Sequence, residues 1–122
     1  MNFDNELDRP EAPQLLSPAD EAVITETNEV TLEWSTAPDA VEYHVEVFDE
    51  KDGYSSEEEF RSSVATETDT TSPLSNGWKR WRVEAVNPEG RVSYSSSSRF
   101  FVYIGTSITF TDTFGGIAAY SV

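Results

Sequence analysis

The stretch VTLEWSTAPDAVEYHVEVF, residues 30–48, contains two runs in which apolar and polar residues alternate. The apolar positions are Val30, Leu32 and Trp34 in the first run, and Val41, Tyr43, Val45 and Val47 in the second. A period of two is typical of a β-strand that buries one face. Pro38 and Asp39 lie between the runs and favour a turn. We therefore predict two strands joined by a turn, with Glu42, His44 and Glu46 on the outer face of the second strand.

Two later segments repeat this alternation. The segment WKRWRVEAV, residues 78–86, predicts a strand whose inner face carries Trp81, Val83 and Ala85. The sequence NPEG then favours a tight turn. The segment RVSYSSSSRFFVYI, residues 91–104, predicts a last strand. Its two faces carry Phe100, Val102 and Ile104 on one side, and Phe101 and Tyr103 on the other.

The middle of the chain is more polar. The segment DEKDGYSSEEE, residues 49–59, predicts a long loop, and FRSSVATETDTTSPL, residues 60–74, predicts one or two weak, Thr-rich strands. None of these segments shows the 3.6-residue period of a helix. Several short alternating strands with turn signals between them indicate an all-β fold, a β-sandwich of two sheets.

The charges on two predicted strands indicate which strands are neighbours. Glu42 and Glu46 lie on the outer face of one strand, and Arg80 and Arg82 lie on the outer face of the other. Opposite charges that face each other across strands contribute about 0.2–1 kcal/mol per pair. We therefore expect these two strands to be adjacent, with the acids facing the arginines.

From about Pro13 to Val102 the chain resembles a fibronectin type III domain of the bacterial kind. The segments that carry the resemblance are PQLLSPAD, VTLEW, APDAVEYHVEV, WRVEAVNPEG and SSSRFFV. The resemblance implies a seven-stranded sandwich of two sheets without chemistry of its own, used as a spacer, an adhesion module or an assembly unit. Members of this family usually carry a corner tyrosine two residues before the position of Trp81. Lys79 occupies that position here, so the resemblance implies that this corner is closed in another way.

The resemblance leaves both ends of the chain outside the sandwich. We expect an extended acidic leader over residues 1–12, the sandwich over residues 13–104 and a strand-like tail over residues 105–122. The chain begins without the basic and apolar regions of a signal peptide, and it has no run of the roughly 18 apolar residues that span a membrane. With Met1 in place, we expect a complete gene product made inside a cell, with a piece of a larger exported protein as the alternative.

The charge balance excludes several classes of partner. The formal net charge is −15, and residues 1–60 carry 18 acidic residues against two basic ones. Nucleic acids and anionic membrane surfaces need the opposite sign, so we expect no nucleic-acid binding and no membrane insertion. The acidity has two interpretations, which are solubility and adaptation to high salt. The chain has no cysteine, which excludes thiolate chemistry and Cys-ligated metals.

The sequence contains no recognisable catalytic set, and we expect neither an enzyme nor a bound cofactor. The single histidine, His44, is expected on a strand surface beside glutamates.

Asp49, Glu50 and Asp52 offer a weak calcium possibility, although they lack the ligand spacing of an EF-hand. A solvated loop is the favoured interpretation. The run at 57–59 is expected to be charged surface. Trp78 either stacks on a sugar or, as we favour, fills one end of the core.

The candidate partner-binding residues lie near the C-terminus. Phe101 and Tyr103, next to Phe48 and with His44 nearby, are expected to form an exposed aromatic patch. Such a patch marks an interface, unless a terminal extension of the same chain covers it.

The tail continues with the apolar residues Ile108, Phe110, Phe114, Ile117 and Tyr120. Burying these five side chains contributes roughly 7–15 kcal/mol, whereas ordering the 18 residues of the tail costs roughly 18–36 kcal/mol. Backbone hydrogen bonds to a sheet edge must supply the difference. We therefore expect the tail to add as a β-strand to another copy of the chain or to a protein partner. The alternatives are docking on its own domain or the start of a second domain.

These observations favour a non-catalytic structural subunit that assembles through its terminal strands into a larger particle or appendage. A virion component such as a capsid, tail or fibre protein is the favoured setting, with an extracellular or cell-surface module close behind. The alternative function is an accessory carbohydrate- or protein-binding module from a secreted enzyme or adhesin.

Overall fold

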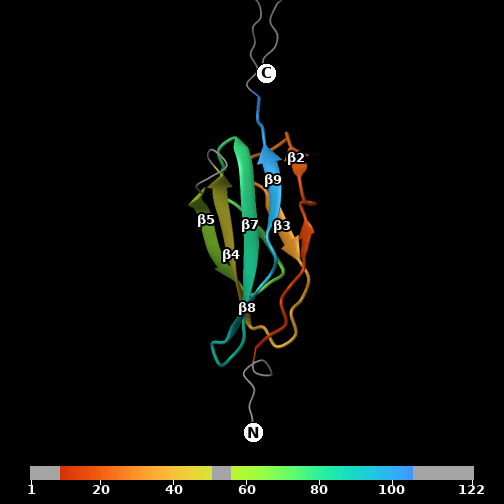
Figure 1. Ribbon diagram of the computed structural model, residues 1–122, viewed down its shortest axis with the longest axis vertical. Coiled ribbons are helices and arrows are strands. Elements are labelled where there is room, and N and C mark those ends of the chain that lie inside the picture. Colours follow the sequence, from red (N-terminus) through yellow and green to blue (C-terminus); the bar gives the residue numbers. More distant parts are fainter. Residues whose placement is uncertain (1–8, 51–55, 106–122) are drawn as a thin grey trace, which may run out of the picture.

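The computed structural model describes residues 9–50 and 56–105, which form nine β-strands and no helix (Figure 1). The strands are β1 (Leu15–Ser17), β2 (Ala22–Ile24), β3 (Thr31–Trp34), β4 (Glu42–Glu50), β5 (Ser56–Val64), β6 (Thr68–Thr70), β7 (Gly77–Val86), β8 (Val92–Tyr94) and β9 (Ser98–Val102). The predicted all-β fold is confirmed. Within the described residues there is no helix that could span a membrane.

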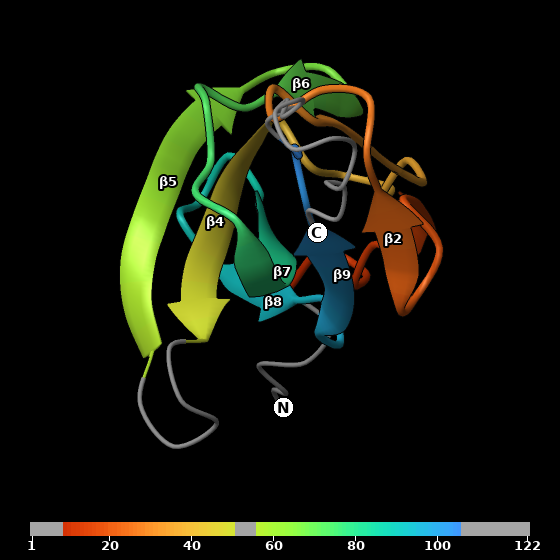
Figure 2. The same ribbon diagram turned by 90° about the horizontal axis from the view of Figure 1, so that it is seen from above.

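The strands form two sheets that face each other (Figure 2). The small sheet has the order β1-β3-β6, and the large sheet has the order β2-β9-β7-β4-β5, with β8 paired to β7. All pairs are antiparallel except β2 with β9. The chain passes from the small sheet at β1 to the large sheet at β2, whereas β5 is a free edge strand of the described sheet. The fold therefore has two short strands, β2 and β8, beyond the seven that the resemblance implied.

The core lies between the two sheets and is built by the predicted alternation. The inward side chains of β3, β4, β7 and β9 are almost completely buried, and three aromatic rings form the centre of the core. The Trp34 ring contacts Tyr43 at 5.6 Å and Trp81 at 6.5 Å between ring centroids, both edge to face. The Tyr43 hydroxyl accepts a hydrogen bond from the Ala37 backbone N–H at 3.0 Å and donates one to Glu67 at 3.1 Å. These bonds satisfy the phenol inside the core.

The prediction for Val41 is wrong. We expected this side chain to point into the core, but it is 53% exposed. Val41 precedes the first residue of β4 and lines an open hollow at one end of the sandwich together with Asn87 and Pro88. An alternating pattern gives the side of a strand on which a residue lies. It does not tell how far along the strand the opposite sheet covers that side.

The predicted loop over residues 49–59 is largely wrong as well. Strand β4 continues through Glu50, and β5 begins at Ser56. Acidic residues can form part of β4 and β5 here because cationic side chains of β7 lie beside them. Lys79 contacts Asp49 and Glu59, and Arg80 contacts Glu50. The Thr-rich segment forms the end of β5 and the short strand β6, as predicted.

The described chain enters at one end of the long axis and leaves at the other (Figure 1). At the entry, Pro10 is buried, and its carbonyl accepts a hydrogen bond from the Ser93 hydroxyl at 2.6 Å. At the exit, the chain follows the line of β9 to Gly105. We refer to these ends as the entry pole and the exit pole.

Candidate interaction surface

Ion pairs organise the outer face of the large sheet. The Glu46 carboxylate accepts hydrogen bonds from Arg82 Nε at 2.7 Å and from Arg61 at 2.8 Å. The two arginines cover the carboxylate, so Glu46 is buried although it points outward. Glu50 forms ion pairs with Arg80 and with Arg99. These contacts give cationic partners to two carboxylates whose side chains are almost fully buried.

The predicted pairing of β4 with β7 is confirmed, although the partners differ in part. Glu46 faces Arg82 as expected, whereas Arg80 pairs with Glu50 instead of Glu42. Glu42 lies opposite Val86, and its carboxylate contacts His44.

His44 lies between two carboxylates. Its Nε2 is 2.5 Å from Glu42 and its Nδ1 is 2.8 Å from Glu84. Carboxylates only accept hydrogen bonds, so both ring nitrogens can donate only in the protonated imidazole. Burial lowers the pKa of His44, but the hydrogen bonds and charges of Glu42 and Glu84 raise it by more, and the net effect is a raised pKa.

An apolar row crosses the outer face at the exit pole. It consists of Val23 on β2, Phe101 on β9 and Trp78 on β7, which are consecutive partners in the strand register. The rings of Trp78 and Phe101 pack edge to face at 5.1 Å, and the Arg99 guanidinium lies 4.1 Å from the Trp78 ring centroid. Val23 is 63% exposed, and Tyr103, which follows Phe101 on the same face of the chain, is 37% exposed.

This row differs from the expected aromatic patch. Phe101 and Tyr103 lie on the outer face as predicted, but β7 separates them from Phe48 on β4. His44 pairs with residue 84 near the other end of β7, away from the position where Phe101 pairs. Trp78 does not fill the core, because the β7 alternation that buries Trp81 turns Trp78 outward.

A hollow of about 440 Å³ adjoins the apolar row. Its lining consists of Asp49, Glu50, Asn76, Gly77, Trp78 and Phe101. The Asn76 side chain binds the backbone of Ile104, accepting from its N–H at 2.9 Å and donating to its carbonyl at 3.5 Å. Asn76 therefore fixes the backbone close to the point at which the described chain leaves the sandwich.

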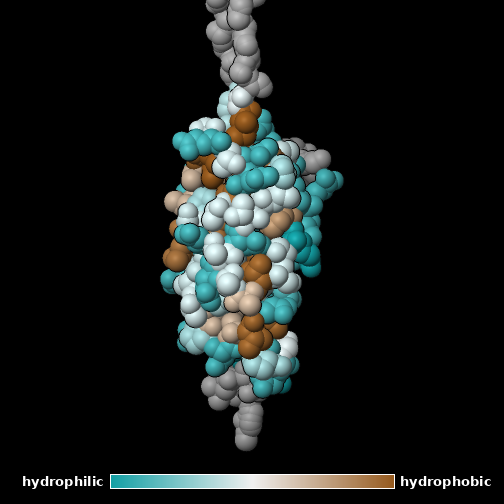
Figure 3. Space-filling model, turned by 180° about the vertical axis from the view of Figure 1, so that it is seen from behind, coloured by the Kyte–Doolittle hydropathy of each residue, from teal (hydrophilic) through white to brown (hydrophobic). Residues whose placement is uncertain are grey.

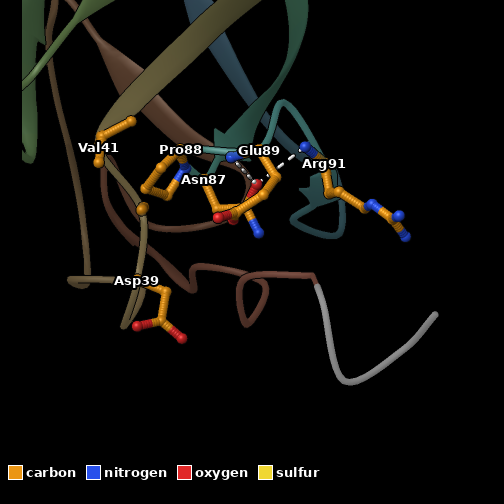
Figure 4. Close-up of a pocket in the computed structure, with 7 residues that line it drawn as sticks. Asp39, Val41, Asn87, Pro88, Glu89 and Arg91 are labelled. Carbon is orange, nitrogen blue, oxygen red and sulfur yellow. Dashed lines mark hydrogen bonds between the residues drawn. The ribbon is translucent and has the colours of Figure 1, made fainter. Parts of the chain in front are cut away.

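A second hollow, of about 580 Å³, lies at the entry pole (Figure 4). The turn at Asn87 forms one wall, where the side-chain oxygen accepts hydrogen bonds from the backbone N–H groups of Glu89 at 3.1 Å and Arg91 at 2.9 Å. Asp39 and Val41 form the opposite wall. The hollow is open to solvent, and its charged groups do not converge on one point, so it offers no built ligand site.

Lys79 closes the corner where the family tyrosine was expected. Its side chain is fully buried, and Nζ donates to Asp49 at 2.8 Å, to Glu59 at 2.6 Å and to Ser75 Oγ at 2.7 Å. A β-bulge supplies one of these acceptors. Phe48 pairs with Glu58 and Val47 pairs with Phe60, which leaves Glu59 as the extra residue. Bulges redirect side chains in this way.

The remaining sequence candidates have different outcomes. Asp49 binds Lys79, and Asp52 lies outside the described residues, so the calcium possibility stays a prediction. Within the described residues, no group of three or more His, Cys, Asp or Glu side chains could hold a metal ion. Glu59 binds Lys79, so the run at 57–59 is more than charged surface. The five tail candidates, Ile108, Phe110, Phe114, Ile117 and Tyr120, lie outside the described residues.

Comparisons with known proteins rest on structure alone. No protein-family model matches the chain, and no curated protein sequence matches it. Among solved structures, the chain is similar to an Fn3-like protein from Clostridium thermocellum, with 22% identity and a TM-score of 0.55 over 77% of this chain and 94% of that one. It is also similar to the fibronectin(III)-like modules of CbhA from the same organism, with 17% identity and a TM-score of 0.54 over 74% and 93%.

The fold is that of a fibronectin type III domain. The fibronectin type III domain of human fibronectin type III domain containing protein 3 is similar as well, with 18% identity and a TM-score of 0.53 over 85% of this chain and 92% of that one. At these identities the likeness concerns the backbone arrangement. The outer-face residues of this fibronectin type III-like domain must be interpreted from its own structure.

Sequence reasoning missed two features of this fibronectin type III-like domain. Strand β2 was not predicted, so Val23 was not recognised as part of an apolar row. The inward position of Lys79 could have been predicted, since it has the same parity as Trp81 on β7. A charged side chain at an inward position is itself a signal, because burying it requires partners.

Proposed function

We propose that this fibronectin type III-like domain is a non-catalytic structural module that joins a larger protein assembly through its terminal segments. The observation that carries the proposal is that the described chain enters and leaves at opposite poles of the sandwich. A domain of this shape extends an assembly along its long axis and presents each flanking segment to a neighbour.

The chemistry of the outer surface supports a binding role over a catalytic one. His44 is held by two glutamates, and Asp49 and Glu59 are engaged by Lys79. These side chains already form hydrogen bonds or ion pairs in the folded state, so they are poor candidates for a catalytic base or nucleophile. The joining element that we propose is the C-terminal segment 105–122, added as a β-strand to a protein partner or to another copy of the chain.

The setting that we propose is a particle or a surface appendage. A virion component and a cell-surface module both fit a self-contained sandwich without disulfides. The similarity to the fibronectin(III)-like modules of CbhA supports a module within a larger protein. A search for a leader sequence in the gene would separate the two settings.

The experiment is size exclusion with light scattering on the full chain and on a version that ends at Ile104. Both are measured at low salt and at about molar NaCl, where the repulsion between acidic surfaces is screened. We expect the full chain to associate and the shortened chain to stay monomeric. Two equally stable monomers would contradict the proposal.

The alternative function is an accessory carbohydrate- or protein-binding module. One comparison favours it, because pectate lyase Pel3 from Pectobacterium carotovorum is similar with 19% identity and a TM-score of 0.50 over 73% of this chain but only 26% of that one. A domain of this shape therefore occurs as part of a longer enzyme chain. Monomers in the scattering experiment, together with a catalytic domain beside this one in the gene, would support this alternative.

A further inference from the structure

The apolar row at the exit pole has the properties of a docking surface. Val23 is an exposed side chain on the edge strand β2, and it is continuous with Phe101 and Trp78 across three strands. Tyr103 extends the row toward the exit pole. Three or more adjacent apolar side chains on the surface of a small domain mark an interface more often than isolated ones do.

The charged groups beside the row are paired with opposite charges, in contrast to those of the small sheet. Arg99 stacks on Trp78 and pairs with Glu50 and Glu21, and Arg80 also pairs with Glu50. The small sheet carries no Lys or Arg on its described strands. Figure 3 shows the molecule from behind, on the side of the small sheet, with separate brown spots among white and teal surface. A second acidic copy therefore meets less repulsion at the row than on the small sheet.

Up to Gly105, the described chain does not turn back over the row. Asn76 holds both backbone groups of Ile104, and the chain runs past the exit pole in line with β9 to Gly105. The Ile104 side chain packs against the core, on the opposite side of the sheet from the row. The last described residue, Gly105, thus lies beyond the end of β9, past the positions at which the row pairs.

We propose that the apolar row of one copy binds the apolar side chains of residues 106–122 of a second copy. This inference rests on the proposed function and identifies its acceptor surface. The segment contains Ile108, Phe110 and Phe114, and its only charged side chain is Asp112. A nearly neutral, apolar segment matches a nearly neutral, apolar row, and each buried side chain of this kind contributes about 1.5–3 kcal/mol.

The test compares two matched substitutions in the full chain at about molar NaCl. Val23→Glu places a charge in the row, and Leu16→Glu places the same charge on the small sheet at a residue with similar exposure, 57% against 63%. We expect Val23→Glu to weaken association at least about tenfold, because the new carboxylate would be buried without a partner. Leu16→Glu should leave association within about twofold of the parent chain. Sedimentation equilibrium measures both constants.

Other results would separate the inference from the proposed function. If truncation at Ile104 abolishes association but Val23→Glu and Leu16→Glu behave alike, the tail assembles elsewhere and the row is not its acceptor. If Val23→Glu lowers the melting temperature of a chain that stays monomeric throughout, the row is covered by its own tail, which overturns the inference. If Val23→Glu fails to fold, Tyr103→Glu replaces it, with the same expected loss of association.

Discussion

At the scale of single residues, Lys79 is the most informative side chain. It stands where the resemblance implied a corner tyrosine, and its three ammonium hydrogens meet three acceptors from β4, β5 and the segment before β7. Ser75 completes the corner, because its backbone N–H donates to the second oxygen of Glu59 at 2.7 Å. One buried cation thus joins three parts of the chain at this corner.

We expect Lys79→Met to destabilise the domain by about 3 kcal/mol, because it leaves Asp49 and Glu59 facing each other without a cation. Urea denaturation measures the free energy of unfolding. Arg80→Met is the matched control on the same strand. Arg80 is half exposed, and Glu50 keeps Arg99 as a partner, so the control should cost no more than about 1 kcal/mol. Equal losses in both variants would contradict a special role for the corner.

His44 makes stability depend on pH. Its pKa in the folded state is raised, so its contribution is fully present below the unfolded value of about 6.5 and is lost as the pH rises through the folded value. We expect the parent chain to exceed His44→Gln in stability by a larger margin at about pH 6 than at about pH 9. Chemical denaturation at the two pH values measures both margins. A constant difference would show that the pKa of His44 is the same in the folded and unfolded states, which would contradict the ion pairs with Glu42 and Glu84.

At the scale of elements, the pairing of β4 with β7 and β5 decides the geometry of the large sheet. Their register places Glu46 between Arg82 on β7 and Arg61 on β5. The sequence predicted this neighbourhood for β4 and β7, because alternating strands with opposite charges favour adjacency. It predicted only the second half of β5, because the acidic run at 57–59 has the composition of a loop. Glu59 gains its partner Lys79 through the bulge, which the sequence does not show.

We expect Glu46→Gln to cost about 1–2 kcal/mol, because it weakens two charge-assisted hydrogen bonds at a buried position. Glu58→Gln is the control, since Glu58 pairs with the same Arg61 but is much more exposed, and the change should cost less than about 0.5 kcal/mol. Thermal unfolding followed by circular dichroism compares the variants. A larger loss for Glu58→Gln would contradict the three-strand arrangement.

At the scale of the whole molecule, the charge is unevenly distributed between the two sheets. The described cations on strands all belong to β5, β7 and β9 of the large sheet, where they pair with acids. On the small sheet, Glu33 is exposed on β3 and has no cationic partner among the described residues. The ion pairs offset negative charge on the large sheet only. The remaining acidic groups, which give the net charge of −15, therefore repel one another.

We expect salt to stabilise the domain for this reason. Raising NaCl from about 0.1 M to about 1 M shortens the screening length from about 10 Å to about 3 Å. The melting temperature should rise by roughly 5 °C, which corresponds to about 1 kcal/mol for a domain of this size. Differential scanning calorimetry measures the change. Glu33→Gln should reduce the salt effect, and a melting temperature that does not increase up to molar salt would contradict adaptation to high salt.

The sequence by itself determined the two-sheet sandwich and most of its core. The alternation of apolar and polar residues is a local property that can be read from each segment alone. It is found at residues 30–34, 43–47 and 81–85. The tertiary structure alone decided which outer-face residues meet. The row of Val23, Phe101 and Trp78 draws on three strands that are distant in sequence. Its members become neighbours only through sheet order and register, and these depend on long-range pairing that no single segment encodes.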